Sequence, residues 1–375
     1  MTTFRLLKNG VEAFPAMVQA VEHAALSIAL EMYIIVDDNT GRLFREHLIG
    51  AAKRGIPVQV LVDAWGSWNL PDVFWDDLRT AGGTVRWFHP LLKGLFPFRN
   101  HRKLLLVDDQ VAYIGGMNIA DEYYHGAHGE LPWRDNVLEI SGLEVARLRR
   151  SFLRMWDKAD PPYRRLFHWL SNKHRLRTVT GTVVRFLESG PENPMQPVRH
   201  AYRQTVQNAV KNIDLAMSYF YPHGRMLLAL KHAVRRGVRV RLLFTRKIDM
   251  AVARWAAHGL YGRLLRAGIE VWEYEPTVMH AKLAIADETV VVGSANLDIR
   301  SGKINHELVA LVTDASIAAK ARSDFEDDLI HSHRVHLKDW ERRPLIQKLK
   351  ERISYFLLAR TDIYVARLEM ARKMR

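Results

Sequence analysis

The chain has 375 residues, a formal net charge of +14 and an isoelectric point near 9.9, and it contains no cysteine. The length predicts two domains or one duplicated domain, and the basic charge favours an anionic partner: nucleic acid, an acidic membrane surface or a phosphate-bearing substrate. The lack of cysteine excludes disulfides, zinc–thiolate sites and thiol nucleophiles.

Strands and helices predicted along the first half recur in the same order in the second half. In the first half they are a strand in 4–10, a helix over 11–25, a strand over 28–33, a helix ending at 54–55, a strand over 58–62 and a helix ending at 81–82. In the second half they are a strand in 184–190, a helix over 198–211, a strand over 213–219, a helix ending at 236–237, a strand over 238–243 and a helix ending at 267–268. This alternation indicates parallel βαβ units with helices on both faces, so we predict an α/β fold made of two similar halves.

We expect the first half to cover residues 1–160 and the second to cover 181–335. Prolines at 161 and 162 begin a linker, 161–180, whose basic and aromatic segment is either solvated or a membrane or substrate surface. Apolar and aromatic loops at 91–98 and 123–133 would suit an acyl chain, although they could equally fold onto the core.

The remaining residues, 336–375, form a basic C-terminal tail with apolar residues at mostly helical spacing. These are Leu345, Leu349, Ile353, Phe356, Leu357, Tyr364 and Leu368. Such a helix could lie on an anionic bilayer, or it could pack on the body with its charged side in water. No apolar run is long enough to span a membrane and no signal peptide precedes the first strand, so we expect an intracellular, non-spanning protein.

The most specific pattern is a six-residue cassette that occurs twice. The first copy consists of His101, Lys103, Asp108, Gly115, Gly116 and Asn118, and the second of His280, Lys282, Asp287, Gly293, Ser294 and Asn296. A histidine and a lysine two residues apart lie on one face of a strand. The spacing from aspartate to glycine is one residue shorter in the second copy, which predicts a tighter hairpin turn at Glu288–Thr289.

If the two halves pack about a pseudo-twofold axis, both cassettes converge on one site at their interface. Two imidazoles, two ammonium groups and two asparagine amides suit a phosphodiester, and no carboxylate cluster asks for a metal or other cofactor. Lys103, Lys282, Asn118 and Asn296 would hold the phosphate oxygens, and Gly116 and Ser294 would allow close approach. One histidine could attack phosphorus while the other donates a proton to the leaving group.

Each histidine needs a carboxylate that fixes its tautomer, and the candidates are Asp135 for His101 and Glu307 for His280, each the carboxylate that follows in the same half. Asp108 and Asp287 complete the predicted catalytic cassettes. They stand at the ends of the cassette strands, so we assign them a structural role more readily than a chemical one.

The doubled cassette resembles the phospholipase D superfamily over nearly all of residues 1–330. Ser294 to Ser301 followed by Asn305-His306-Glu307, together with Ile114 to Ile119 and Trp133-Arg134-Asp135, are similar to the bacterial cardiolipin synthases of the short, peripheral type without N-terminal spanning helices. The resemblance implies two α/β/α halves and metal-free transfer of a phosphatidyl group between phosphatidylglycerols, with release of glycerol. It also implies His101 as the nucleophile, His280 as the acid and base, and a peripheral location on the cytoplasmic side of the inner membrane.

Two other functions remain open. The superfamily includes phosphodiesterases that hydrolyse phospholipid or nucleic acid, and a basic protein could also be a non-catalytic binding scaffold. The apolar loop before His101, the basic tail and the residues after Asn296 favour lipid over nucleic acid, and two intact cassettes argue against a scaffold.

Overall fold

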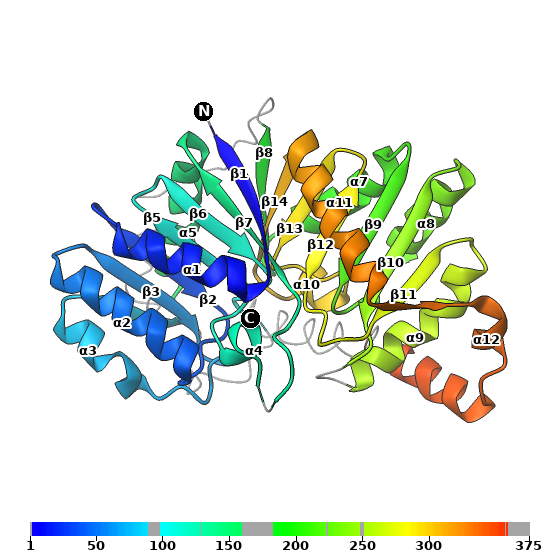
Figure 1. Ribbon diagram of the computed structural model, residues 1–375, viewed down its shortest axis with the longest axis horizontal. Helices are drawn as coiled ribbons and strands as arrows, with labels where there is room; N and C mark the ends of the chain where they lie inside the picture. Colours follow the sequence, from blue (N-terminus) through cyan, green and yellow to red (C-terminus); the bar gives the residue numbers. More distant parts are fainter. Residues whose placement is uncertain are drawn as a thin grey trace, which may run out of the picture.

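The computed structural model describes residues 2–88, 98–127, 129–159, 183–222, 224–247, 251–356 and 358. They form two lobes side by side, each built on one mixed β-sheet with helices packed against it (Figure 1). The predicted duplicated α/β architecture is therefore confirmed. The linker over 161–180, the loop residues 91–97 and the tail after 358 lie outside the described residues.

The first lobe follows the predicted alternation of strands and helices. Its strands are β1 (Thr3–Lys8), β2 (Ile28–Met32), β3 (Val58–Asp63), β4 (Thr84–Phe88), β5 (Leu104–Val107), β6 (Val111–Gly115) and β7 (Asn136–Ser141). Its helices are α1 (Asn9–Glu22), α2 (Asn39–Lys53), α3 (Asp76–Thr80), α4 (Asp121–Tyr124) and α5 (Ala146–Lys158), with 3₁₀ turns η1 (Asp72–Trp75) and η3 (Leu143–Val145). The sheet order is β1-β7-β6-β5-β2-β3-β4, in which β2, β3 and β4 are parallel and the other pairs antiparallel.

The second lobe repeats this topology. Its strands are β8 (Val184–Ser189), β9 (Asn212–Met217), β10 (Arg239–Thr245), β11 (Glu270–Tyr274), β12 (Lys282–Ala286), β13 (Thr289–Gly293), β14 (Glu307–Thr313) and β15 (Ser332–Val335). Its helices are α7 (Pro197–Asn208), α8 (Gly224–Arg235), α9 (Ala251–Leu265), α10 (Ile299–Lys303), α11 (Ala315–Ile330) and α12 (Leu337–Glu341). The order β15-β11-β10-β9-β12-β13-β14-β8 matches the first sheet strand for strand, with β15 added at one edge.

The two lobes share one hydrophobic core. Leu104 and Leu138 of the first lobe belong to the same buried cluster as Leu283 and Leu308 of the second, together with side chains of α5 and α11. Two further cores lie on the outer faces of the sheets, one in each lobe. A common core fixes the lobes relative to each other, so that a site at their border is held by packing rather than by a flexible joint.

The cassette hairpins differ by one residue, as the spacing predicts. Three residues, beginning with Asp108, join β5 to β6, whereas only Asp287 and Glu288 join β12 to β13. The tighter turn therefore lies one position earlier than the predicted Glu288–Thr289. Asp108 and Asp287 both adopt left-handed backbone conformations, with φ of 57° and 51°, and the extra residue is absorbed within the turn without changing the pairing that follows.

The described part of the tail is α12 and a helix over residues 345–356. The apolar residues predicted to share a face are exposed on this helix, whereas Glu351 and Ser354 face the body and are buried. Glu351 is held by Arg343 at 2.6 Å and lies 3.6 Å from His258. Of the two alternatives for the tail, packing of the apolar face on the body is therefore excluded for this helix. Within the described residues, no helix combines the length and hydrophobicity needed to cross a bilayer.

Candidate active site

Each catalytic histidine lies in a short extended segment that pairs with the opposite lobe. The backbone N–H of His101 donates to the carbonyl of His306 at 3.0 Å, and the N–H of His306 donates back to Arg99 at 2.8 Å. In the same way the N–H of His280 donates to Arg134 at 2.7 Å. Both histidines precede the cassette strands rather than lying within them, since β5 begins at Leu104 and β12 at Lys282. The lobes are thus joined by backbone hydrogen bonds at the site.

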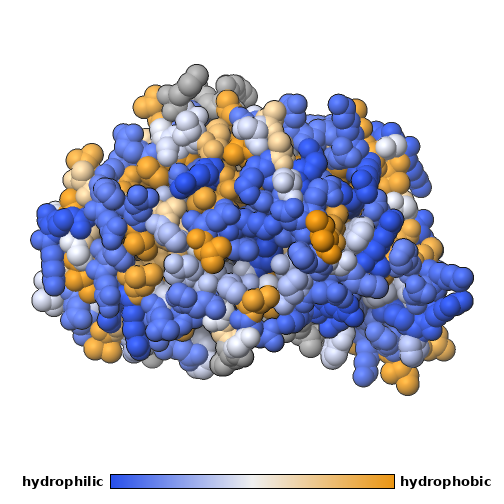
Figure 2. Space-filling model, viewed as in Figure 1, coloured by the Kyte–Doolittle hydropathy of each residue, from blue (hydrophilic) through white to orange (hydrophobic). Residues whose placement is uncertain are grey.

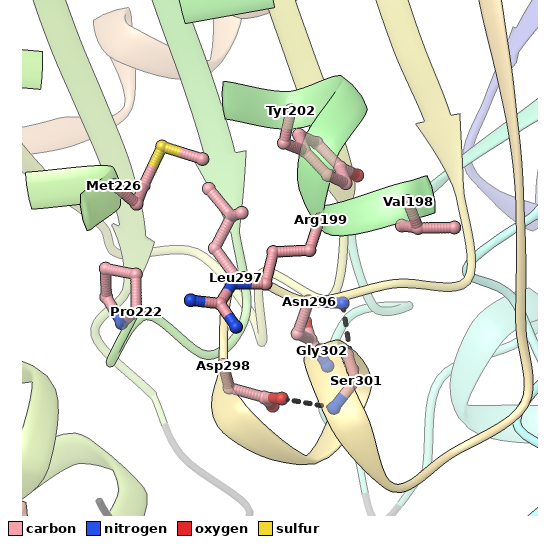
Figure 3. A pocket seen from close by; sticks show the side chains of 10 residues that line it. All are labelled: Val198, Arg199, Tyr202, Pro222, Met226, Asn296, Leu297, Asp298, Ser301 and Gly302. Atoms are coloured by element: carbon pink, nitrogen blue, oxygen red, sulfur yellow. Dashed lines mark hydrogen bonds between the residues drawn. The ribbon is translucent and has the colours of Figure 1, made fainter. Parts of the chain in front are cut away.

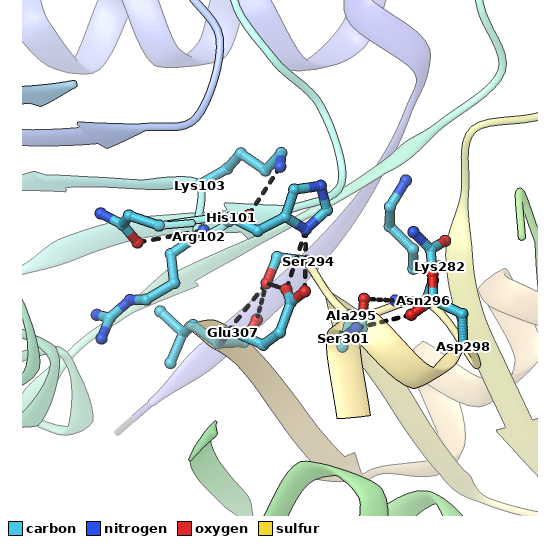
Figure 4. Close-up of polar contacts among 12 residues, drawn as sticks. His101, Arg102, Lys103, Lys282, Ser294, Ala295, Asn296, Asp298, Ser301 and Glu307 are labelled. Carbon is cyan, nitrogen blue, oxygen red and sulfur yellow. Dashed lines mark hydrogen bonds and ion pairs between the residues drawn. The ribbon is translucent and has the colours of Figure 1, made fainter. Parts of the chain in front are cut away.

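The histidine–carboxylate pairs cross between the lobes. Nδ1 of His101 lies 3.1 Å from both carboxylate oxygens of Glu307 (Figure 4). Nδ1 of His280 lies 2.7 Å from Oδ2 of Asp135. The two carboxylates were correctly expected beside the histidines, but the pairing within each half is wrong. The reason is the backbone exchange described above, which places the start of each lobe's carboxylate-bearing strand beside the other lobe's histidine.

The pKa values of the site residues are shifted by burial and by the closeness of like charges. Burial, followed by the charge of Lys282, lowers the pKa of Lys103 to about 7 and that of His280 to about 4. Burial also lowers the pKa of His101, although Glu307 opposes the shift. Burial alone would raise the pKa of Glu307, but the charge of His101 and its hydrogen bond lower it. A phosphate placed among these groups would favour the charged forms of Lys103 and the two histidines.

The lysine ammonium groups lie beside the histidines on both sides. Nζ of Lys103 donates to the carbonyl of His101 at 2.7 Å and lies 4.9 Å from the centre of the Tyr33 ring. Nζ of Lys282 lies 3.1 Å from Nε2 of His280 and donates to the hydroxyl of Ser218 at 3.2 Å. Each lobe therefore supplies one histidine and one ammonium group to the same small region, as the duplicated cassette predicts.

The asparagines and Gly116 also lie at the lobe border. Asn118 donates to the hydroxyl of Tyr123 at 2.8 Å, whereas neither atom of the Asn296 side-chain amide has a hydrogen-bond partner in the described chain. A Cβ atom at Gly116 would lie 2.6 Å from the Asp135 carboxylate and 2.8 Å from Lys282. A residue with a side chain cannot occupy this position without displacing two site residues.

Three predicted residues are engaged elsewhere. The hydroxyl of Ser294 donates to Glu307 and accepts from the backbone of Leu308 at 3.0 Å, so it positions a carboxylate rather than facing an open space. Asp108 and Asp287 lie at the far ends of β5 and β12 from the histidines. Each carboxylate accepts three backbone N–H groups, from residues 25–27 and 210–212 respectively, at 2.7 to 3.0 Å.

Aromatic side chains surround the histidines, and the cassette pattern gave no sign of them. The ring of Tyr33 lies 4.8 Å from His101, and the rings of Tyr123 and Trp133 lie 5.3 and 5.7 Å from His280. Tyr123 and Trp133 belong to the apolar loop noted in the sequence, which could have drawn attention to them. Among the residues that the structure describes, no group of three or more His, Asp or Glu side chains could hold a metal ion.

Comparisons with known proteins agree with this geometry. Residues 17–156 and 202–329 match the family described as "Cardiolipin synthase, PLD-like domain". The chain is 32% identical over 359 residues to the major cardiolipin synthase ClsA of Bacillus subtilis, covering 94% of this chain and 74% of that protein. It is 33% identical over 368 residues to cardiolipin synthase 2 of Bacillus anthracis, covering 96% of this chain and 70% of that protein.

Solved structures show the same fold at low sequence identity. Phosphatidylserine synthase from Haemophilus influenzae superposes with a TM-score of 0.72 at 14% identity, covering 97% of this chain and 94% of that one. Polyphosphate kinase from Porphyromonas gingivalis superposes with a TM-score of 0.58 at 15% identity, covering 90% of this chain and 49% of that one. The matched family model and the relatives place the chain in the cardiolipin synthase family of phospholipase D-like phosphatidyltransferases.

Proposed function

We propose that the protein makes cardiolipin by transferring a phosphatidyl group from one phosphatidylglycerol to another through a phosphohistidine intermediate, with release of glycerol. The observation that carries the proposal is the pair of crossed histidine–carboxylate contacts around one cluster of buried cations. The names of the relatives support the choice of lipid.

In the first step, Nε2 of His101 attacks phosphorus, and the bond from phosphorus to the glycerol oxygen breaks. Glu307 accepts the Nδ1–H of His101, which leaves Nε2 available and stabilises the positive charge that the ring acquires. His280 gives its proton to the departing glycerol oxygen. The phosphate draws this proton onto His280 when the substrate binds, because its negative charge raises the pKa of a histidine that is neutral in the free site.

In the second step, His280 is neutral and accepts the proton of the acceptor hydroxyl. The oxygen of that hydroxyl forms a bond to phosphorus as the bond from phosphorus to Nε2 of His101 breaks, which returns both histidines to their starting states. Lys103, Lys282 and the two asparagines hold the non-bridging oxygens in both steps, where their charge and hydrogen bonds stabilise the pentacoordinate transition state.

We further propose that the protein acts as a peripheral enzyme on the anionic, cytoplasmic surface of the inner membrane. Leu345, Ile346, Leu349, Ile353 and Phe356 are each at least half exposed on the helix over 345–356. This helix lies at the lower right in Figure 1, along the same edge as α4, which carries Tyr123. Figure 2 shows apolar atoms at this corner below a largely hydrophilic face. Burial of these side chains and attraction of a basic protein to anionic lipid would act together.

The test is to incubate the purified protein with phosphatidylglycerol vesicles and, separately, with single- and double-stranded DNA, each with and without a chelator. We expect cardiolipin and free glycerol in equal amounts, with or without the chelator, and intact DNA. Cleaved DNA with unchanged lipid would refute the proposal. Release of phosphatidic acid in place of cardiolipin would indicate a hydrolase. His101→Ala and His280→Ala should each abolish cardiolipin formation.

A further inference from the structure

A hollow beside the active site leads away from Asn296 between α7 and α8. Its inner part is lined by Tyr202, Met226, Leu297, the Asn296 amide and the carboxylate of Asp298, which donors of Ser301 engage (Figure 3). Its outer part, about 570 Å³, shares Arg199 and Met226 with the inner part, so the two are adjoining. The inner wall is mainly apolar, whereas the outer part is basic. We call the outer part the arginine hollow.

Three arginines and a histidine line the arginine hollow: Arg199, Arg203, Arg225 and His200. In the described chain, no carboxylate lies within ion-pair distance of Arg199 or Arg203, which contact Gln196 and His200 at 3.0 Å instead. Nε of Arg203 is buried without a partner. Burial and the charges of Arg225 and Arg203 lower the pKa of Arg199. The fold thus holds like charges together at a cost that a bound anion would offset.

The backbone adds to this positive potential. α7 begins at Pro197 and α8 at Gly224, and residues of both amino-terminal turns line the arginine hollow. In the first turn of α7, Pro197 has no N–H and the N–H of Val198 donates to Oγ of Ser189 at 3.2 Å, so this end contributes mainly its dipole. Unpaired N–H groups and helix dipoles at such ends favour phosphate groups, so the amino ends of α7 and α8 and the three arginines favour the same kind of ligand.

Asn296 joins the hollow to the reacting groups. Its side-chain amide has no partner in the described chain, its Oδ1 is buried, and it lies beside Lys282 in Figure 4. A buried amide without partners is costly unless a ligand supplies them. A molecule whose charged group sits among the arginines could therefore place a hydroxyl beside Asn296, next to the phosphorus that the histidines handle.

We propose that the arginine hollow binds the phosphodiester of the second, acceptor phospholipid and that the acceptor's headgroup glycerol extends past Asn296 to the catalytic histidines. The inference rests on the proposed function. A transferase that joins two phospholipids through glycerol must hold a second phosphate one glycerol away from the reacting one, whereas a hydrolase needs no such site. Tyr202, Met226 and Leu297 of the inner part would contact the carbons of the headgroup glycerol, and the diacylglycerol would extend outward from the arginine hollow.

The test compares two reactions of the full-length protein. One is cardiolipin formation, in which the acceptor carries a phosphate, and the other is exchange of labelled glycerol into phosphatidylglycerol, in which the acceptor carries none. The double variant Arg199→Gln/Arg203→Gln should lower cardiolipin formation about 10-fold or more, as expected for lost charge-assisted hydrogen bonds to phosphate. It should leave glycerol exchange nearly unchanged. Lys231→Gln/Arg235→Gln on α8 removes the same charge outside the hollow and should alter neither reaction. An equal loss of both reactions, or no loss in the first, would overturn the proposal.

Binding of soluble probes separates this inference from the proposed function. We expect glycerophosphoglycerol, the deacylated headgroup, to bind the wild type and the Lys231→Gln/Arg235→Gln control more tightly than the Arg199→Gln/Arg203→Gln variant in calorimetry. Equal affinity for inorganic phosphate would assign the hollow to free phosphate and overturn the acceptor assignment. If the wild type made no cardiolipin but bound the headgroup in a way that depends on the arginines, the proposed function would be refuted and the hollow would remain an anion-binding site. No headgroup binding by the wild type would refute the site itself.

Discussion

Replacing Glu307 with glutamine removes a buried charge from the partner of His101 while keeping the size of the side chain. The carboxylate is fully buried and lies 3.1 Å from Nδ1 of His101, so in the proposed mechanism it would stabilise the positive ring of the phosphohistidine without competition from water. Loss of a buried, charge-assisted hydrogen bond should raise the barrier by about 2–4 kcal/mol, or slow turnover roughly 30- to 1000-fold. Asp135→Asn should slow proton transfer by His280, and therefore turnover, to a similar extent.

Substrates with different leaving groups distinguish a defect in the nucleophile His101, caused by Glu307→Gln, from a defect in the proton donor His280, caused by Asp135→Asn. Phosphatidyl-p-nitrophenol needs no proton donor, because nitrophenolate leaves unaided. In a single turnover, Asp135→Asn and His280→Ala should therefore release the first equivalent of nitrophenol at a nearly normal rate and then stall, because His280 is still the base of the second step, whereas Glu307→Gln and His101→Ala should be slow from the start. Exposed Glu288 provides a matched Glu288→Gln control, which should behave as wild type, and thermal unfolding should verify that all variants fold. If Glu307→Gln were rescued and Asp135→Asn were not, the crossed pairing or the choice of His101 as nucleophile would be refuted.

Three further outcomes are expected. Lys103 has a depressed pKa of about 7 and binds phosphate only when protonated, so kcat/KM should fall as pH rises above 7. Lys103→Arg should move this decline to higher pH, because arginine stays protonated. If the pH profile did not move, the decline would belong to another group. Gly116→Ala should lower kcat at least 10-fold, because the new Cβ would lie 2.6 Å from an oxygen of Asp135. The control Gly50→Ala, where no atom would lie closer than 4.0 Å, should retain full activity. Equal activities of the two variants would show that the site rearranges to accept a side chain at Gly116. Leu349→Ser/Ile353→Ser should weaken sedimentation with phosphatidylglycerol vesicles without slowing turnover of detergent-dispersed substrate, and unchanged sedimentation would remove the helix over 345–356 from the membrane contact.

Both lobes could be predicted from the sequence, because the same strands and the same cassette recur in the same order and at nearly the same spacing. A histidine and a lysine two residues apart in an extended segment have their side chains on the same face. A repeat of the whole pattern indicates a second, similar lobe. These features depend on local periodicity, which a sequence displays directly.

The pairing of histidines with carboxylates could not be predicted in this way. Asp135 follows His101 in the chain as Glu307 follows His280, so sequence distance favours pairs within a lobe. The actual partners depend on backbone hydrogen bonds between residues far apart in the sequence, such as His101 with His306. Tertiary contacts of this kind leave no periodic trace. The sequence also left open whether the apolar face of the helix over 345–356 would point outward or pack on the body, because Glu351, which faces the body, has its ion-pair partners on other elements.

The exchange of carboxylates also bears on how such a protein could diverge. Neither cassette histidine has its carboxylate partner in its own lobe. Under the proposed mechanism an isolated lobe would therefore be inactive however well it folded, and a harmful change in one lobe would affect the histidine of the other. The two halves of such a duplicated protein must therefore evolve together. One half can specialise for the donor phospholipid and the other for the acceptor only while both remain in one chain.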